Sequence, residues 1–123
     1  MPIEHYGNWT GFAQVYLEDS YVLEIMETKD TLEFDMELVL REGHPAYTVP
    51  GAEEQYCYKR GKVVFRGVRD VSWHERKDVV SWDARGERDL GNIDVLCLDE
   101  GWFRLQGDWG RVRLHATEVG LEL

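Results

Sequence analysis

The stretch that decides the fold is Thr31–Arg41, TLEFDMELVLR. Leu32, Phe34, Met36, Leu38 and Leu40 alternate with residues that are mostly polar. Because side chains of a β-strand point to opposite faces in turn, this period of two predicts a strand with one face in a core and one in water. The C-terminal segment repeats the pattern around Val112, Leu114 and Ala116. Both segments predict strands of antiparallel sheets.

Further short segments of strand character lie between clusters of turn-forming residues. The expected strands are 12–18, 21–27, 55–59, 62–71, 93–98 and 102–106, with turns at Glu18-Asp19-Ser20, Arg60-Gly61 and Gly107-Asp108-Trp109-Gly110 among others. Gly67 interrupts the apolar alternation of its segment, which indicates a β-bulge. We therefore expect an all-β fold: an antiparallel β-sandwich or partly open barrel of about eight or nine strands, mostly in up-and-down order.

The length of 123 residues suits a single β domain, 1–123, with enough core to need no disulfide or metal. Residues 70–89 form a long polar excursion that we expect at one end of the domain, with a short strand near Val79–Trp82. Cys57 and Cys97 lie far apart in strand-like surroundings, so we expect two small buried hydrophobic side chains rather than a bridge. No apolar stretch is long enough to span a bilayer, and the first ten residues do not resemble a secretion signal, which predicts a cytoplasmic protein.

The formal charge of -10 is distributed unevenly along the chain. Residues 1–54 carry a net charge of -10, residues 55–88 of +4 and residues 89–123 of -4. The negative net charge argues against binding to extended nucleic acid or to anionic membranes, because both kinds of binding depend on an excess of Lys and Arg. It argues less strongly against a small anion held by the basic middle segment. Glu33, Asp35 and Glu37 line the wet side of one strand, and three hypotheses follow. Basic strand neighbours pair with them, or they stay unpaired and meet a basic protein partner, or they form a solvated face that keeps the protein soluble.

The second candidate site lies within the polar excursion. Trp73-His74-Glu75 opens it and Trp82-Asp83 closes it, so Trp73, His74, Trp82 and Asp83 are candidate ligand-binding residues at the mouth of a barrel. A histidine beside a carboxylate also suits a general base, which leaves an enzyme open as an alternative. The competing interpretation is that the two tryptophans pack the loop onto the sheet while His74 and Asp83 face water.

No local motif indicates catalysis, a cofactor or a metal site. The four histidines and two cysteines have no metal-ligand spacing, and no nucleophile elbow or phosphate-binding glycine loop occurs. A calcium site among Asp83, Asp89 and Asp94 is an alternative without the spacing of a known loop. We therefore expect no catalytic residue, no metal and no cofactor.

Several strings resemble those of short bacterial β-proteins of a family with no assigned function. These are YLEDSYVL at 16–23, EQYCY at 54–58, DLGNID at 89–94 and GDWG at 107–110. In size, acidity and expected β content the chain is also similar to some bacterial immunity proteins that neutralise toxins. The combined expectation is a non-catalytic binding protein that recognises a basic protein through its acidic face. The alternative is a small-ligand-binding barrel with its mouth near residues 73–83, and a homodimer formed by sheet edges is a further alternative.

Overall fold

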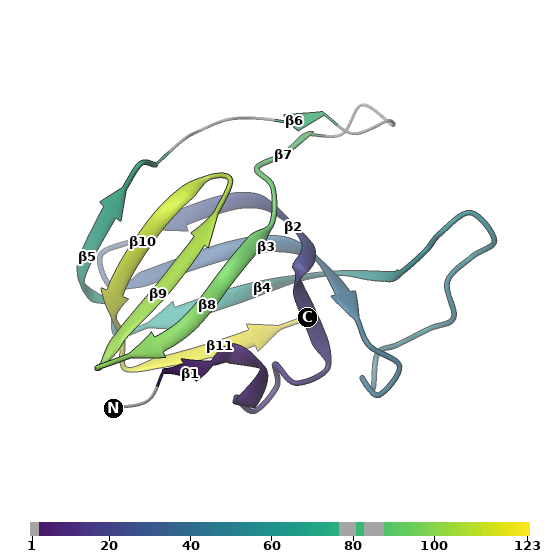
Figure 1. Cartoon of the computed structure of the whole chain (residues 1–123), viewed down its shortest axis with the longest axis horizontal. Coiled ribbons are helices and arrows are strands. Elements are labelled where there is room, and N and C mark those ends of the chain that lie inside the picture. The colour runs from purple at the N-terminus through teal and green to yellow at the C-terminus, as the bar shows by residue number, and fades with distance from the viewer. Residues whose placement is uncertain (1–2, 77–80, 83–87) are drawn as a thin grey trace.

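Two antiparallel sheets pack against each other as a sandwich. The computed structural model describes residues 3–76, 81–82 and 88–123. The four-stranded sheet has the order β11-β4-β3-β2 and contains β2 (Val15–Glu27), β3 (Thr31–Leu40), β4 (Cys57–Arg66) and β11 (Glu118–Glu122). The five-stranded sheet has the order β1-β8-β9-β10-β5 and contains β1 (Glu4–His5), β5 (Arg69–His74), β8 (Ile93–Asp99), β9 (Trp102–Gly107) and β10 (Gly110–His115). In Figure 1, β8, β9 and β10 lie in front of β2, β3 and β4.

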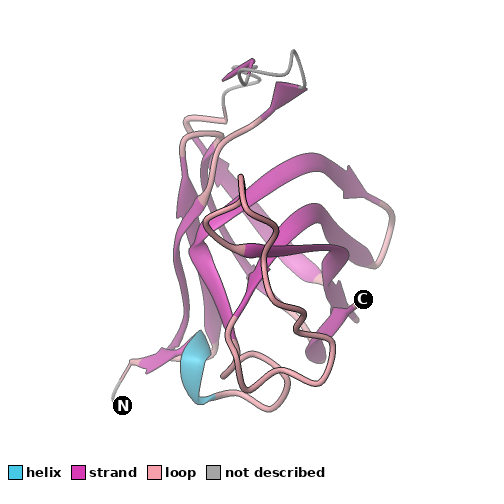
Figure 2. Ribbon diagram, turned by 90° about the vertical axis from the view of Figure 1, so that its right-hand side faces the viewer, coloured by secondary structure: helices cyan, strands magenta, loops and turns pink. Residues whose placement is uncertain are grey.

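This architecture confirms the predicted all-β antiparallel fold of about eight or nine strands, and of the two arrangements predicted it is the sandwich, because the two sheets do not close into a barrel. Two up-and-down runs, β2-β3-β4 and β8-β9-β10, supply six of the strands. The short helical turn η1 (Tyr6–Asn8) follows β1 and is the cyan element of Figure 2. The predicted hairpin at Gly107–Gly110 joins β9 to β10 with Gly107 and Gly110 as register partners.

The core between the sheets is aromatic and aliphatic. β3 gives Leu32, Phe34, Met36 and Leu38 to it, each with 0% exposure, as the alternation predicts. Trp109 at the tip of the β9-β10 hairpin is also completely buried, and its Nε1 donates a hydrogen bond of 3.0 Å to the carbonyl oxygen of Asn92. The two cysteines are free and buried, as predicted. Burial, with a smaller contribution from Asp99, raises the pKa of the Cys97 thiol.

The predicted turn at Glu18-Asp19-Ser20 is wrong, because β2 runs through it as one strand of 13 residues. The register with β3 shifts between Tyr16 and Tyr21, so backbone groups there lose their ladder partners. The buried Ser20 hydroxyl supplies substitutes: it accepts from the Val39 N–H at 2.9 Å and donates to the Tyr16 carbonyl at 2.5 Å. A polar side chain thus continues the strand where sequence propensity indicated a turn.

Two glycine predictions also need correction. Arg60-Gly61 is not a turn, because β4 continues through it, and a Cβ at Gly61 would lie 2.5 Å from the carbonyl oxygen of Glu122 in β11. Gly67, with φ of +66°, does not form a bulge within one strand. It lies where the chain leaves β4 in one sheet and enters β5 in the other, and Val68 there donates its N–H to the Asp30 carbonyl. Both glycines serve contacts between distant segments that local sequence does not reveal.

The excursion predicted at 70–89 begins later than expected. Residues 70–74 belong to β5, which pairs with β10 as an edge strand. The short strand expected near Val79–Trp82 corresponds in the described residues to β6 (Ser81–Trp82), which pairs with β7 (Arg88–Asp89) above the sandwich in Figure 1. Val79 lies outside the described residues.

The link between β7 and β8 also touches the outer edge of β2. The N–H of Val22 donates to the Gly91 carbonyl at 2.8 Å, and the N–H of Leu90 donates to the Val22 carbonyl at 2.8 Å. Two residues from a distant part of the chain therefore occupy the middle of this sheet edge.

Candidate functional site

The acidic outer face of the four-stranded sheet comes from the polar half of the β3 alternation. Glu33, Asp35 and Glu37 point away from the core, because their neighbours along the strand are buried. β4 places Lys62 opposite Asp35 and Arg60 opposite Glu37. The structure therefore interleaves basic with acidic side chains, as the first hypothesis for this face predicted.

Of these three carboxylates, Asp35 is the one whose charge is paired within the sheet. The Arg60 guanidinium donates to both of its carboxylate oxygens, from Nε at 3.1 Å and from Nη2 at 2.8 Å. This bidentate contact is the main cause of a lowered pKa for Asp35, with smaller contributions from the charges of Arg60 and Lys62. Asp35 is committed to a neighbour within the sheet.

Glu33 and Glu37, unlike Asp35, have no ion-pair partner among the described residues. Neither forms an ion pair with any residue in the described part of the chain. Glu33 lies between Met26 of β2 and Val64 of β4, and neither of these side chains carries a charge. Glu37 faces Arg60, whose guanidinium is turned to Asp35 instead. Two of the three predicted partner-binding carboxylates are therefore available to an external cation.

Tyrosine side chains border Glu37. Tyr21 of β2 is its register partner and stacks on Tyr58 of β4, with ring centroids 6.0 Å apart and planes inclined by 26°. Burial, followed by the influence of Tyr21, raises the pKa of Tyr58 to about 12, so the phenol stays neutral at physiological pH. Tyr21 retains 37% of its surface exposed. We call Glu33, Glu37, Tyr21 and Tyr58 the acidic tyrosine surface.

A groove of about 920 Å³ adjoins this surface. The connection between β3 and β4, residues 41–56, extends away from the sheets in Figure 1 and contributes Glu53 and Glu54 to the groove wall. Glu37 and Tyr58 form the side that belongs to the sheet. Three carboxylates, Glu37, Glu53 and Glu54, therefore line the groove where loop and sheet meet.

The four residues predicted to bind a ligand do not form one site in the described structure. Trp73 and His74 are neighbours on β5 and therefore point to opposite faces of the sheet. Trp73 turns toward the core and meets Trp109 edge to face at 5.9 Å, while Arg76 lies over its ring. Trp82 lies in β6, and Asp83 lies outside the described residues. The Trp73 ring packs against the core, as the competing interpretation expected, and its role in ligand binding stays a prediction.

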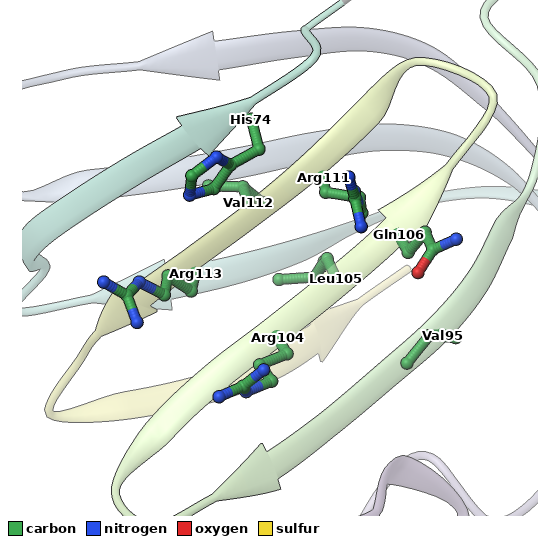
Figure 3. Close-up of a pocket in the computed structure, with 8 residues that line it drawn as sticks. All are labelled: His74, Val95, Arg104, Leu105, Gln106, Arg111, Val112 and Arg113. Carbon is green, nitrogen blue, oxygen red and sulfur yellow. The ribbon is translucent and has the colours of Figure 1, made fainter.

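His74 lines a different groove, of about 440 Å³, on the outer face of the five-stranded sheet (Figure 3). Its other polar walls are Arg111 and Arg113 of β10 and Arg104 and Gln106 of β9. The arginines of this groove were not among the predicted site residues. One signal for them was present in the sequence, because a two-residue turn at Asp108-Trp109 pairs Gly107 with Gly110 and hence Arg104 with Arg113.

The described residues offer little for a metal site. No three His, Cys, Asp or Glu side chains among them lie close enough together to hold a metal ion. Of the calcium candidates, Asp83 lies outside the described residues, while Asp89 and Asp94 lie in β7 and β8. The described part of the chain also has no helix with the length and apolar character needed to cross a bilayer.

Comparisons with protein-family models, curated proteins and solved structures found no match to this chain. The resemblance to short bacterial β-proteins stays a prediction. Proposals about function therefore depend on the geometry of the two charged faces.

Proposed function

We propose that this is a non-catalytic binding protein that recognises a basic protein partner through the acidic tyrosine surface. The observation that carries the proposal is the position of Glu37, a carboxylate without an ion-pair partner in the described residues, beside the stacked rings of Tyr21 and Tyr58. Tyrosines are enriched among the residues that dominate binding energy at protein interfaces. Unpaired carboxylates around them supply the field that attracts a basic partner and increases its association rate.

The groove beside Glu37 supports a partner with a protruding basic segment. Glu53 and Glu54 form its far wall, so a Lys or Arg side chain entering it approaches carboxylates from two sides. Asp35 is excluded from this role, since its two oxygens already accept from Arg60. The proposed surface is thus displaced from the middle of β3 toward Glu37 and the 41–56 connection.

Affinity capture with matched baits tests the proposal. We expect the wild-type bait to recover a basic protein from the native host at low salt, and the Glu33→Gln/Glu37→Gln bait to lose it. Glu4→Gln/Glu100→Gln is the control, because both of these exposed carboxylates lie on or beside the five-stranded sheet and the net charge changes equally. Association with the purified partner should slow as ionic strength rises. A partner held equally by both double variants, or a rate that does not respond to salt, contradicts the proposal.

A second candidate function, small-ligand binding, is favoured by the groove that contains His74. Its chemistry differs from that of the acidic tyrosine surface, because most of its polar walls are arginines.

A further inference from the structure

The groove on the five-stranded sheet gathers positive charge on a strongly acidic protein. Residues 89–123 contain three basic side chains, Arg104, Arg111 and Arg113, and all three line this groove. Figure 3 shows their guanidinium groups and the His74 ring on the same side of the sheet, above the backbone of β9 and β10. Leu105 and Val112 form its floor and are themselves core residues.

The register of the sheet forces like charges together. Arg104 and Arg113 are direct cross-strand partners in the β9-β10 hairpin, and Arg111 has His74 of β5 as its partner on the other side. Like charges directly opposite each other destabilise a sheet. An anion bound between Arg104 and Arg113 would convert this repulsion into two attractive contacts, so the arrangement favours occupancy by a ligand.

Each arginine is held in place by a contact that leaves most of its donors free. Arg104 Nε lies 3.5 Å from an Asp99 oxygen, Arg111 Nη2 lies 3.2 Å from a Glu75 oxygen, and Arg113 lies over the Trp102 ring at 4.7 Å. A guanidinium has five N–H donors in a planar fork, and each of these ion pairs joins one nitrogen to one oxygen. Both arginines are about half exposed, so these ion pairs neutralise the groove only weakly.

We propose that this groove binds a compact oxyanion that carries at least two negative charges on phosphoryl or carboxylate groups. Arg104, Arg111 and Arg113 pair with its oxygens, and Gln106 supplies an uncharged hydrogen-bonding group at the edge. The volume of about 440 Å³ lies within the range of small-molecule sites. The carboxylates of Asp99 and Glu75, which pair with Arg104 and Arg111, repel a polyanion that extends beyond the groove. The ligand is therefore limited to a small one. This site lies on the opposite sheet from the acidic tyrosine surface and does not depend on it.

Calorimetric titration with sodium pyrophosphate and, separately, sodium citrate tests the site in low-salt buffer without divalent cations. We expect saturable binding with one site per chain, a higher Tm in the presence of the anion, and amide shifts confined to β5, β9 and β10. Arg104→Gln/Arg113→Gln should weaken binding at least about tenfold, since charge-assisted hydrogen bonds are lost. Arg60→Gln/Arg66→Gln removes the same charge from the other sheet, and its affinity should stay within about twofold of wild type.

The pair of probes distinguishes the source of the oxyanion. Binding of pyrophosphate alone identifies a phosphoryl ligand, binding of citrate alone a carboxylate ligand, and binding of both a site that selects on charge. The proposal is overturned if neither anion saturates the folded protein by about 10 mM. A Kd above that concentration is weaker than a specific small-ligand site provides. Equal weakening in the two double variants also overturns it. The Tm of the double variant without anion separates loss of fold from loss of binding. Removing Arg104 and Arg113 relieves their repulsion but also removes the Asp99 and Trp102 contacts, so we expect this Tm to stay close to that of wild type.

Discussion

Ser20→Ala should destabilise the protein far more than a serine change on a strand normally does. The Ser20 side chain is completely buried, and its Oγ accepts from the Val39 N–H and donates to the Tyr16 carbonyl. Alanine leaves that buried N–H without its partner, which costs about 1–3 kcal/mol. Unfolding entropy of roughly 2.1 cal/mol/K per residue over 123 residues makes each kcal/mol equal to about 4 °C in Tm. We therefore expect Tm to fall by about 4–12 °C.

Differential scanning calorimetry of the variant, compared with Ser72→Ala, measures this effect. Ser72 is half-buried in β5 and makes no side-chain hydrogen bond to another described residue, so its replacement should change the free energy of unfolding by less than about 0.5 kcal/mol. Hydrogen exchange at the Val39 amide should accelerate in Ser20→Ala. A Tm within about 2 °C of wild type, with unchanged exchange at Val39, would refute the view that this hydroxyl carries the irregular part of the β2-β3 ladder.

Three further changes test other parts of the structure. Gly61→Ala should lower the free energy of unfolding by about 1–3 kcal/mol, because the new Cβ meets the Glu122 carbonyl, whereas a Cβ at Gly120 meets only Arg66 Nη1 at 4.0 Å; equal losses in denaturant titrations would contradict this. The lowered pKa of Asp35 means that its stabilisation is complete above the unfolded value, about 3.9, and is lost as pH falls through the folded value. Asp35→Asn should therefore flatten the loss of stability as pH falls below about 4, and an unchanged acid profile would argue against the pairing with Arg60. Trp73→Phe removes a buried indole N–H that has no hydrogen-bond partner in the described residues, which offsets part of the packing lost, so it should cost less than about 1 kcal/mol by chemical denaturation; a larger cost would mean that the lost ring contacts outweigh removal of the unpaired donor.

The parts of the fold that could be predicted from the sequence are those with a purely local cause. β3 was recognisable because the period of two along Leu32–Leu40 does not depend on which strands lie beside it. The errors at Ser20 and Gly61 have the reverse cause. Both residue types favour turns in isolation, and both are held in strands here by distant partners, Val39 and the backbone of β11.

The candidate sites divide in the same way. Glu33 and Glu37 could be placed on one face from their spacing alone, but the pairing of Asp35 with Arg60 joins residues 25 positions apart and required the β3-β4 register. Predicting the arginine groove required knowledge of more long-range pairings. The hairpin register relates Arg104 to Arg113, yet His74 joins them only because the chain crosses between sheets at Gly67 and β5 pairs with β10.

The contact of Leu90 and Gly91 with Val22 has a consequence for the behaviour of this protein in concentrated solution. β2 is a long strand at the edge of its sheet, and such an edge is a template on which another chain can extend the sheet. Two backbone hydrogen bonds from the same chain occupy its middle, so an incoming strand finds its ladder interrupted there. Loss of this contact would free the backbone groups of Val22 on an exposed edge strand, so we expect the 90–91 link to reduce sheet extension between copies of the protein.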